Sequence, residues 1–248
     1  MQIVITMAGL GTRFKKIGIK EPKYEIVAHN KSLFAWSMES LKGYLDKNND
    51  YYFIVRKEDD AEEFIRTEWA KECGLETIDA SKTHVIEIDY MTDGQATTAM
   101  LASTLWKKDD SLLIYNIDTY VEAGAMKAED ICGDGFIPCF NAPGDHWSFV
   151  ALDDNGVATE VREKQRISDN CTLGAYYFKS CSLYEQMYNE YYKSDSNMEA
   201  GEKYVAPLYN YMISKGMEVR ICLVDPKQVH VLGTPEELEI FKALKIHS

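Results

Sequence analysis

The stretch M-A-G-L-G-T-R-F, residues 7–14, follows an apolar, β-branched run and decides how the rest of the chain is interpreted. Residues 2–7 predict a buried strand, because the run is apolar and ends at glycines. Gly9 and Gly11 let the backbone approach a ligand closely, and exposed N–H groups in such a turn favour an anion. The stretch therefore predicts a ligand-binding loop at the carboxyl end of the first strand.

The charge near this loop contrasts with that of the whole chain. Residues 1–24 contain five Lys or Arg side chains and one Glu, whereas the 248-residue chain has 40 acidic and 27 basic side chains and a formal charge of −13. A basic, glycine-rich loop suits a polyphosphate, and a plain surface loop with solvated lysines explains the composition equally well. Phe14 stands where a dinucleotide fingerprint needs a third glycine, and the Gly-Lys-Ser/Thr of a Walker loop is absent.

Beyond the loop, short apolar runs alternate with amphipathic segments. We expect strands at 51–55, 85–88 and 112–115, and helices at 32–45, 58–73 and 94–107, with Ser32 as the cap of the first helix. After residue 118 we expect strands at 136–140, 147–152, 157–161, 173–178, 218–224 and 229–232, and helices at 183–192, 204–214 and from Thr234 onward. The pattern predicts an α/β fold with a doubly wound, Rossmann-like mixed sheet flanked by helices. We expect one domain, residues 1–248, with halves 1–120 and 121–248.

The composition excludes several classes of protein. The acidity argues against a nucleic-acid partner, and no apolar run is long enough for a transmembrane helix. The N-terminus lacks the features of a signal peptide, and the six cysteines form no CxxC pair. We therefore expect a cytoplasmic protein with reduced thiols and no membrane partner.

Six short motifs follow one another along the chain, each occurring once. They are G-x-G-T-R-F followed by Pro22-Lys23, then Asp93-Gly94-Gln95-Ala96, Asn116-Ile117-Asp118, Val161-Arg162-Glu163-Lys164, Leu173-Gly174-Ala175-Tyr176 and Gly233-Thr234-Pro235-Glu236. This order resembles the sugar-nucleotide pyrophosphorylases, a family of sugar-phosphate nucleotidyltransferases that includes glucose-1-phosphate thymidylyltransferases and small cytidylyltransferases of surface-polysaccharide pathways. The resemblance implies the nucleotide-diphospho-sugar transferase fold, with a nucleotide-binding first half and an acceptor-binding second half.

The resemblance also implies a reaction and a set of site residues. An NTP would be joined to a sugar 1-phosphate, or a similar phosphorylated small molecule, with release of pyrophosphate, for capsule or other surface-polysaccharide synthesis. Arg13 would hold the leaving phosphates, Lys23 would lie between the two reacting phosphates, and Asp118 would carry Mg²⁺. The expected nucleotide-binding residues are Met7, Ala8, Gly9, Gly11, Thr12, Arg13, Asp93, Gly94 and Gln95, and the expected acceptor-binding residues are Glu163, Lys164, Gly174 and Tyr176.

The chain departs from the family pattern at two positions. Many members have a second metal-binding aspartate where this chain has Val231, so Asp225, solvent or Asp118 alone would complete the metal site. Tyr24 replaces a second proline. Both departures leave room for a cytidylyltransferase with a non-sugar acceptor, such as a phosphocholine-like or phospho-amino-acid-like molecule. A glycosyltransferase is a more remote alternative, because Asn116 stands where its Asp-x-Asp would begin. We expect the nucleotide substrate to be a pyrimidine NTP, with CTP slightly favoured over UTP and dTTP. A homodimer is left open.

Overall fold

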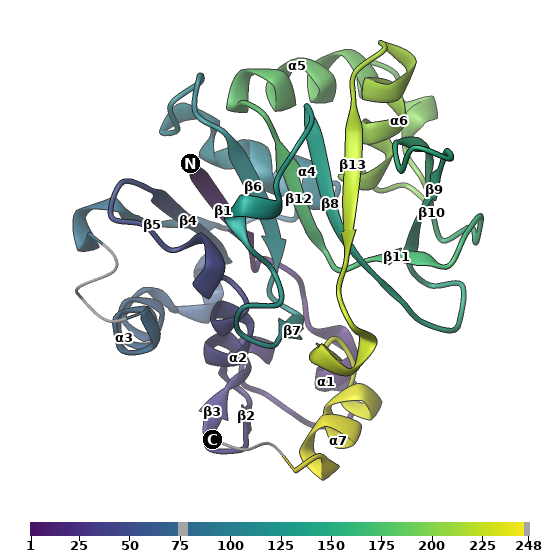
Figure 1. Ribbon diagram of the computed structural model, residues 1–248. Coiled ribbons are helices and arrows are strands. Elements are labelled where there is room, and N and C mark those ends of the chain that lie inside the picture. The colour runs from purple at the N-terminus through teal and green to yellow at the C-terminus, as the bar shows by residue number, and fades with distance from the viewer. Residues whose placement is uncertain (74–78, 246–248) are drawn as a thin grey trace.

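The computed structural model describes residues 1–73 and 79–245, and its centre is a ten-stranded mixed sheet (Figure 1). The strand order is β10-β9-β11-β8-β12-β6-β1-β4-β5, with β13 pairing with β8 outside this path. The strands of the sheet are β1 Gln2–Thr6, β4 Asp50–Arg56, β5 Thr83–Ile88, β6 Leu112–Asn116, β8 Gly135–Asn141, β9 Ser148–Leu152, β10 Ala158–Glu163, β11 Asn170–Thr172, β12 Ala175–Phe178 and β13 Val219–Leu223. The expected α/β fold with a mixed sheet is confirmed.

The first strand lies near the middle of the sheet, as its apolar sequence predicts. β1 pairs in parallel with β4 on one side and with β6 on the other, and β4 pairs in parallel with β5. Ile3 and Ile5 pack into one hydrophobic cluster, and Val4 packs into another on the opposite face. Because alternate side chains of a strand point to opposite faces, a strand covered by helices on both faces must be apolar throughout.

Helices cover both faces of the sheet. They are α1 Thr12–Lys16, α2 Leu33–Glu39, α3 Glu62–Cys73, α4 Gln95–Met100, α5 Cys181–Tyr191, α6 Ala206–Ser214 and α7 Pro235–Ala243. Phe34 of α2 and Trp69 of α3 belong to the cluster that contains Ile3, whereas Ala99 of α4 and Tyr184 of α5 belong to the cluster that contains Val4. Because α2 and α3 pack on one face of the sheet and α4 and α5 on the other, the arrangement is doubly wound.

Three helices are shorter than the sequence pattern predicts. The apolar stripe of α2 runs to Leu45, but the helix ends at Glu39, and Gly43 lies too close to the Met126 carbonyl to carry a side chain. α3 begins at Glu62 rather than 58, because Asp60 has a left-handed φ of 47°. α4 ends at Met100, and a 3-10 turn continues the segment to Thr104.

The second half adds antiparallel strands to the same sheet. β12 pairs antiparallel with β6, which joins the two halves, and β9 and β10 form the expected hairpin. The expected strand at 173–178 begins only at Ala175, as β12, because Gly174 has a left-handed φ of 80°. The short strand β11, Asn170–Thr172, lies before it and was not expected. The sequence pattern missed the short strands β2 Val27–Ala28, β3 Lys31–Ser32 and β7 Thr119–Val121.

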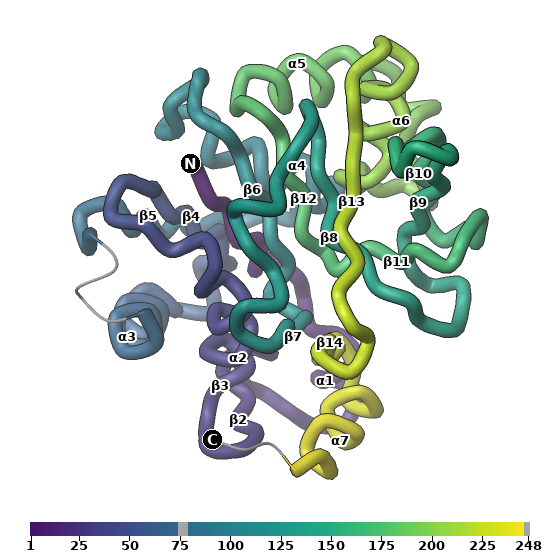
Figure 2. Tube along the Cα trace, viewed as in Figure 1, coloured from purple at the N-terminus to yellow at the C-terminus, as the bar shows by residue number. Residues whose placement is uncertain are grey.

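The end of the chain returns to its beginning. β14, Val229–Val231, pairs antiparallel with β7, and α7 follows it (Figure 2). Phe14 of α1 and Phe241 of α7 pack in one small buried cluster. This contact places the first turn of α7 next to the short connection between β6 and β7, where Asp118 lies. Among the described helices, none has both the length and the apolar character needed to cross a membrane.

Candidate active site

A cavity of about 650 Å³ lies at the carboxyl ends of β1 and β6, where doubly wound sheets bind ligands. It is lined by residues of both halves of the chain. The residues expected from the sequence that line it are Met7, Ala8, Gly9, Gly11, Thr12, Arg13, Lys23, Gly94, Gln95, Asp118, Glu163, Gly174 and Tyr176. Segments more than 160 residues apart in the sequence therefore form one pocket, whereas Asp93, Lys164 and Asp225 do not line it.

The glycine-rich loop forms one wall of the cavity. A Cβ on Gly9 would meet no atom within 4 Å, so the backbone here borders open space that a ligand can enter. Gly11 has a left-handed φ of 60°, a conformation that other residues rarely adopt. The exposed Arg13 makes no salt bridge within the described residues, and its guanidinium is free to form two parallel hydrogen bonds with a phosphate.

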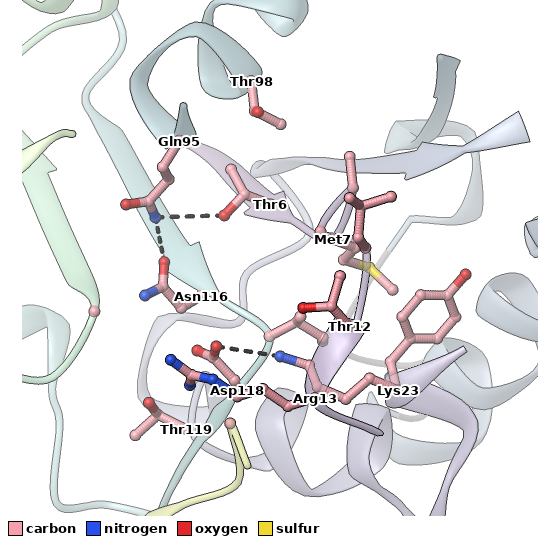
Figure 3. A pocket seen from close by; sticks show the side chains of 18 of the residues that line it. Thr6, Met7, Thr12, Arg13, Lys23, Gln95, Thr98, Asn116, Asp118 and Thr119 are labelled. Atoms are coloured by element: carbon pink, nitrogen blue, oxygen red, sulfur yellow. Dashed lines mark hydrogen bonds and ion pairs between the residues drawn. The ribbon is translucent and has the colours of Figure 1, made fainter. Parts of the chain in front are cut away.

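Lys23 and Asp118 meet in the cavity, although they are 95 residues apart in the sequence. The Lys23 ammonium lies 3.1 Å from Oδ2 of Asp118, and Figure 3 shows the two side chains pointing toward each other. The Lys23 side chain is 17% exposed and that of Asp118 is 38% exposed. A cation and a carboxylate thus lie side by side within reach of a ligand in the pocket, which suits a site for phosphates and a metal ion.

A hydrogen-bonded network closes the inner end of the cavity. Gln95 donates from Nε2 to the Thr6 hydroxyl, at 3.3 Å, and to the Asn116 side-chain oxygen (Figure 3). Gly174 packs so closely here that a Cβ would lie 2.5 Å from Asn116 Nδ2. Thr6 and Asn116 were not among the residues expected from the sequence. Their positions, as the last polar residues of two adjacent parallel strands, are the signal that could have identified them.

Asp93 supports the wall of the cavity from behind. Its carboxylate forms an ion pair with the Lys203 ammonium at 2.7 Å, and its carbonyl accepts the Lys203 N–H at 2.6 Å. Burial raises the pKa of Asp93, but hydrogen bonds from Lys203 and Thr97 outweigh burial and lower it. Gly94 is packed so tightly that a Cβ would lie 2.5 Å from the Lys203 nitrogen. Asp93 therefore holds the Gly94 loop against the second half of the chain.

The second half contributes aromatic and acidic side chains. Besides Glu163 and Tyr176, the cavity is lined by Trp147, Glu202 and Tyr204, which were not among the site residues expected from the sequence. Tyr176 is 5% exposed, and burial raises the pKa of its phenol. Glu202 and Tyr204 belong to no motif. The ion pair of Lys203 with Asp93 and the hydrogen bond between Tyr204 and Lys164 hold this segment at the pocket.

Lys164 lies just outside the cavity, next to Glu163 and Tyr204, which line it. Its ammonium donates to the Tyr204 hydroxyl at 2.7 Å and lies 3.5 Å from Glu163 Oε1. Burial lowers the pKa of Lys164, but the hydrogen bond and nearby charges outweigh burial and raise it, so the side chain stays a cation. Its backbone has a left-handed φ of 52°, which is costly for a residue with a Cβ. Such strain is found where a side chain must be aimed in one direction.

Comparison with solved structures identifies the family. The nucleoside-diphosphate-sugar pyrophosphorylase from Vibrio cholerae RC9 is 31% identical to this chain, with a TM-score of 0.86 over 98% of this chain and 100% of that one. The chain belongs to this pyrophosphorylase family. It is accordingly a nucleotidyltransferase. No protein-family model and no curated protein sequence matches it.

More distant members share the fold at low identity. A Bacillus anthracis protein provisionally assigned as a glucose-1-phosphate thymidylyltransferase is 13% identical with a TM-score of 0.74, over 100% of this chain and 98% of that one. The CTP:phosphocholine cytidylyltransferase from Streptococcus pneumoniae is 15% identical with a TM-score of 0.69, over 97% of each chain. Nucleotidyltransferases with sugar and non-sugar acceptors thus share this architecture.

Pyrophosphorylases of this family generally use a divalent metal ion, and the residues here fit one. Among the described residues there is no group of three metal-ligating side chains. Mg²⁺ does not need such a group, because it is usually held by one or two carboxylates together with substrate phosphates and water. Asp118 supplies one such carboxylate, whereas the exposed Asp225 instead accepts the Lys227 N–H at 2.9 Å, outside the cavity.

Proposed function

We propose that this enzyme transfers the nucleotidyl group of a pyrimidine NTP, CTP slightly preferred, to a phosphorylated small molecule, with a sugar 1-phosphate as the leading acceptor. The observation that carries the proposal is the 3.1 Å contact between Lys23 and Asp118 in the cavity that the glycine-rich loop also lines. Neither residue type is rare, but the two belong to motifs 95 residues apart. A site built only to bind a nucleotide does not require both.

The reaction that these residues support is an in-line displacement. An oxygen of the acceptor phosphate attacks the α-phosphorus of the NTP, a new P–O bond forms, and the bond to the β-phosphate breaks to release pyrophosphate. A phosphate monoester has a second pKa near 6, so it is already a nucleophile near neutral pH and no general base is needed. Catalysis then depends on position and on neutralisation of negative charge.

Each side chain has a distinct task in this proposal. Arg13 binds the leaving β- and γ-phosphates, and Lys23 reduces the repulsion between the α-phosphate and the incoming phosphate. Asp118 holds the divalent ion. Held by Asp118, a divalent ion would supply positive charge that offsets the negative charge developing on the phosphates. Lys164 is aimed toward the acceptor phosphate by its strained backbone, and Glu163 binds a polar group of the acceptor.

The base is assigned to the inner end of the cavity. Met7 to Gly11 and the Gly94–Gln95 segment offer backbone and amide groups that can pair with the edge of a flat ring. The amide of Gln95 is fixed by Thr6 and Asn116, so it presents the same edge to every nucleotide. A wrong base leaves a buried polar group without a partner, which costs about 1–3 kcal/mol.

A second acceptor class is favoured by the composition of the acceptor side. Trp147 and Tyr204 lie with Glu163 and Glu202 around the same part of the cavity, and the Lys164 ammonium already lies 4.6 Å from the centre of the Tyr204 ring. Aromatic faces with nearby carboxylates attract organic cations. A phosphorylated acceptor with a positively charged group, as in phosphocholine or a phospho-amino acid, is therefore the alternative to a sugar 1-phosphate.

Pyrophosphate release from a matrix of substrates tests the proposal. CTP, UTP, dTTP, ATP and GTP are each combined with sugar 1-phosphates, phosphocholine and phosphorylated amino acids, in the presence of Mg²⁺. We expect release with a pyrimidine NTP and one acceptor class, and none without an acceptor. Release of free NDP with transfer of a sugar from an NDP-sugar would instead indicate a glycosyltransferase.

The wider assignments are also proposals. We infer that residues 1–248 work as one domain, with nucleotide bound by the first half and acceptor by the second. Synthesis of capsule or another surface polysaccharide, a cytoplasmic location and a homodimer remain predictions from the sequence.

A further inference from the structure

The metal site raises a question that the sequence pattern leaves open. The position that carries a second aspartate in many members of the family is Val231, which lines the cavity and pairs with Thr119 in the β14–β7 ladder. An isopropyl side chain cannot ligate a cation. Asp118 is then left with the aliphatic side chain of Val231 opposite it, and any second carboxylate must come from another position in the described cavity.

Glu237, in the first turn of α7, has an unused carboxylate oxygen beside the cavity. Its backbone N–H donates to the Thr234 hydroxyl at 3.2 Å, which is half of a capping box. In a complete box the glutamate would accept the Thr234 N–H in return. Instead, Glu237 Oε2 is buried and has no hydrogen-bond partner in the described residues, although Glu237 lines the cavity. A buried carboxylate oxygen without a partner is unfavourable until a ligand binds it.

Gly233 brings this oxygen next to Asp118. A Cβ on Gly233 would lie 3.4 Å from Glu237 Oε2 and 3.5 Å from Asp118 Oδ2, so both oxygens face one point beside the Gly233 backbone. The Asp118 oxygen is the same one that already attracts the Lys23 ammonium. Two facing carboxylates attract a divalent ion, and phosphate oxygens and water complete the ligands of Mg²⁺.

We propose that Glu237 is the second carboxylate ligand of the divalent ion, in place of the aspartate that Val231 replaces. This inference rests on the proposed function, which assigns the first ligand to Asp118. It makes α7 part of the active site rather than only a C-terminal helix. The contact of α7 with α1 then positions the metal relative to the phosphate-binding loop.

The test measures metal binding without turnover. Binding of Mn²⁺ is followed by electron paramagnetic resonance of the free ion, with α,β-methylene CTP present and no acceptor. Glu237→Gln removes the charge but keeps the size, and we expect it to raise the Kd for Mn²⁺ at least ~10-fold. The matched control is Glu236→Gln, an exposed neighbour in the same helical turn that does not line the cavity, and its Kd should stay within about twofold.

A rescue variant separates a ligand from a helix cap. Val231→Asp in the Glu237→Gln background should restore Mn²⁺ affinity, because it returns a carboxylate to the position that the family uses. A purely structural role would change the melting temperature and leave the Kd unaltered. Should Glu237→Gln fold poorly, Glu237→Asp, which retains the charge on a shorter arm, is expected to weaken Mn²⁺ binding in a folded protein.

The possible outcomes distinguish this inference from the proposed function. An unchanged Kd in Glu237→Gln, with weaker binding in Asp118→Asn, would refute the role of Glu237 alone. An unchanged Kd in Asp118→Asn would instead refute the metal assignment on which the proposed function depends.

Discussion

Replacement of Lys23 by alanine tests the charge that the proposed mechanism uses most directly. The ammonium lies 3.1 Å from Asp118 and borders the cavity, so it can reach an α-phosphate bound between the loop and β6. Two unit charges about 4 Å apart interact by about 4 kcal/mol at an effective dielectric constant near 20. Part of that attraction is present before the reaction, and only the increase in the transition state accelerates it. We therefore expect kcat/KM to fall at least ~100-fold, equivalent to about 2.7 kcal/mol.

The fold should tolerate this change. Asp118 is 38% exposed, so water can solvate its carboxylate when the ammonium is removed, and the free energy of unfolding should change by less than about 1 kcal/mol. The matched control is Lys16→Ala, which removes an exposed lysine of the same basic segment that does not line the cavity. Initial rates of pyrophosphate release and the melting temperature are measured for both variants. A Lys23→Ala enzyme with more than about a third of wild-type kcat/KM would refute the assigned role.

Four further predictions follow from the same contacts. Asp118→Asn should abolish Mg²⁺-dependent turnover and leave the metal-free melting temperature nearly unchanged; normal turnover would move the metal site elsewhere. CTP, UTP or dTTP should exceed ATP and GTP by at least ~10-fold in kcat/KM, and a clear preference for a purine would exclude a one-ring slot. Gly94→Ala should destabilise the protein by about 1–3 kcal/mol in urea unfolding, because the new Cβ would lie 2.5 Å from the Lys203 nitrogen; wild-type stability would contradict this packing. The pKa of Asp50 is raised by burial but lowered overall, below 3.8, by hydrogen bonds that include one from Lys107, so its stabilisation is present above pH 3.8 and is lost as the pH falls further. Asp50→Asn should flatten the stability profile below pH 3.8, and an unchanged profile would show that other carboxylates account for the loss of stability.

Local patterns were sufficient for most of the architecture. The buried strand before the glycine loop, the Ser32 and Thr234 caps and the β9–β10 hairpin all appear at the expected places, because each depends on neighbouring residues. The ends of helices were less predictable. α2 ends at Glu39, shortly before Gly43 packs against the distant Met126 backbone, and a contact between segments far apart in the chain leaves no local pattern.

The residues of the candidate active site also differ in how far the sequence could predict them. Arg13, Lys23 and Asp118 could be singled out from the sequence, because their motifs have fixed residue types and a fixed order. Their contact could not be derived from order alone, and it depends on parallel pairing of β1 with β6 and on the turn that carries Lys23. Asp225 shows the limit of such reasoning, since it is acidic and near the expected position but lies outside the cavity.

The sequence by itself determined the fold class, the family resemblance and the position of the glycine-rich loop that lines the cavity, because these depend on local periodicity and on motifs with fixed spacing. Only the tertiary structure decided which other polar groups share the cavity. Asn116 reaches Gln95 because adjacent strands end together, and Glu202 arrives through the ion pair of Lys203. Glu237 and Asp118 both lie beside the Gly233 backbone, because Leu232, next to Gly233, donates its N–H to the Asp118 carbonyl. Such proximity depends on backbone packing between distant segments, which no single stretch of sequence encodes.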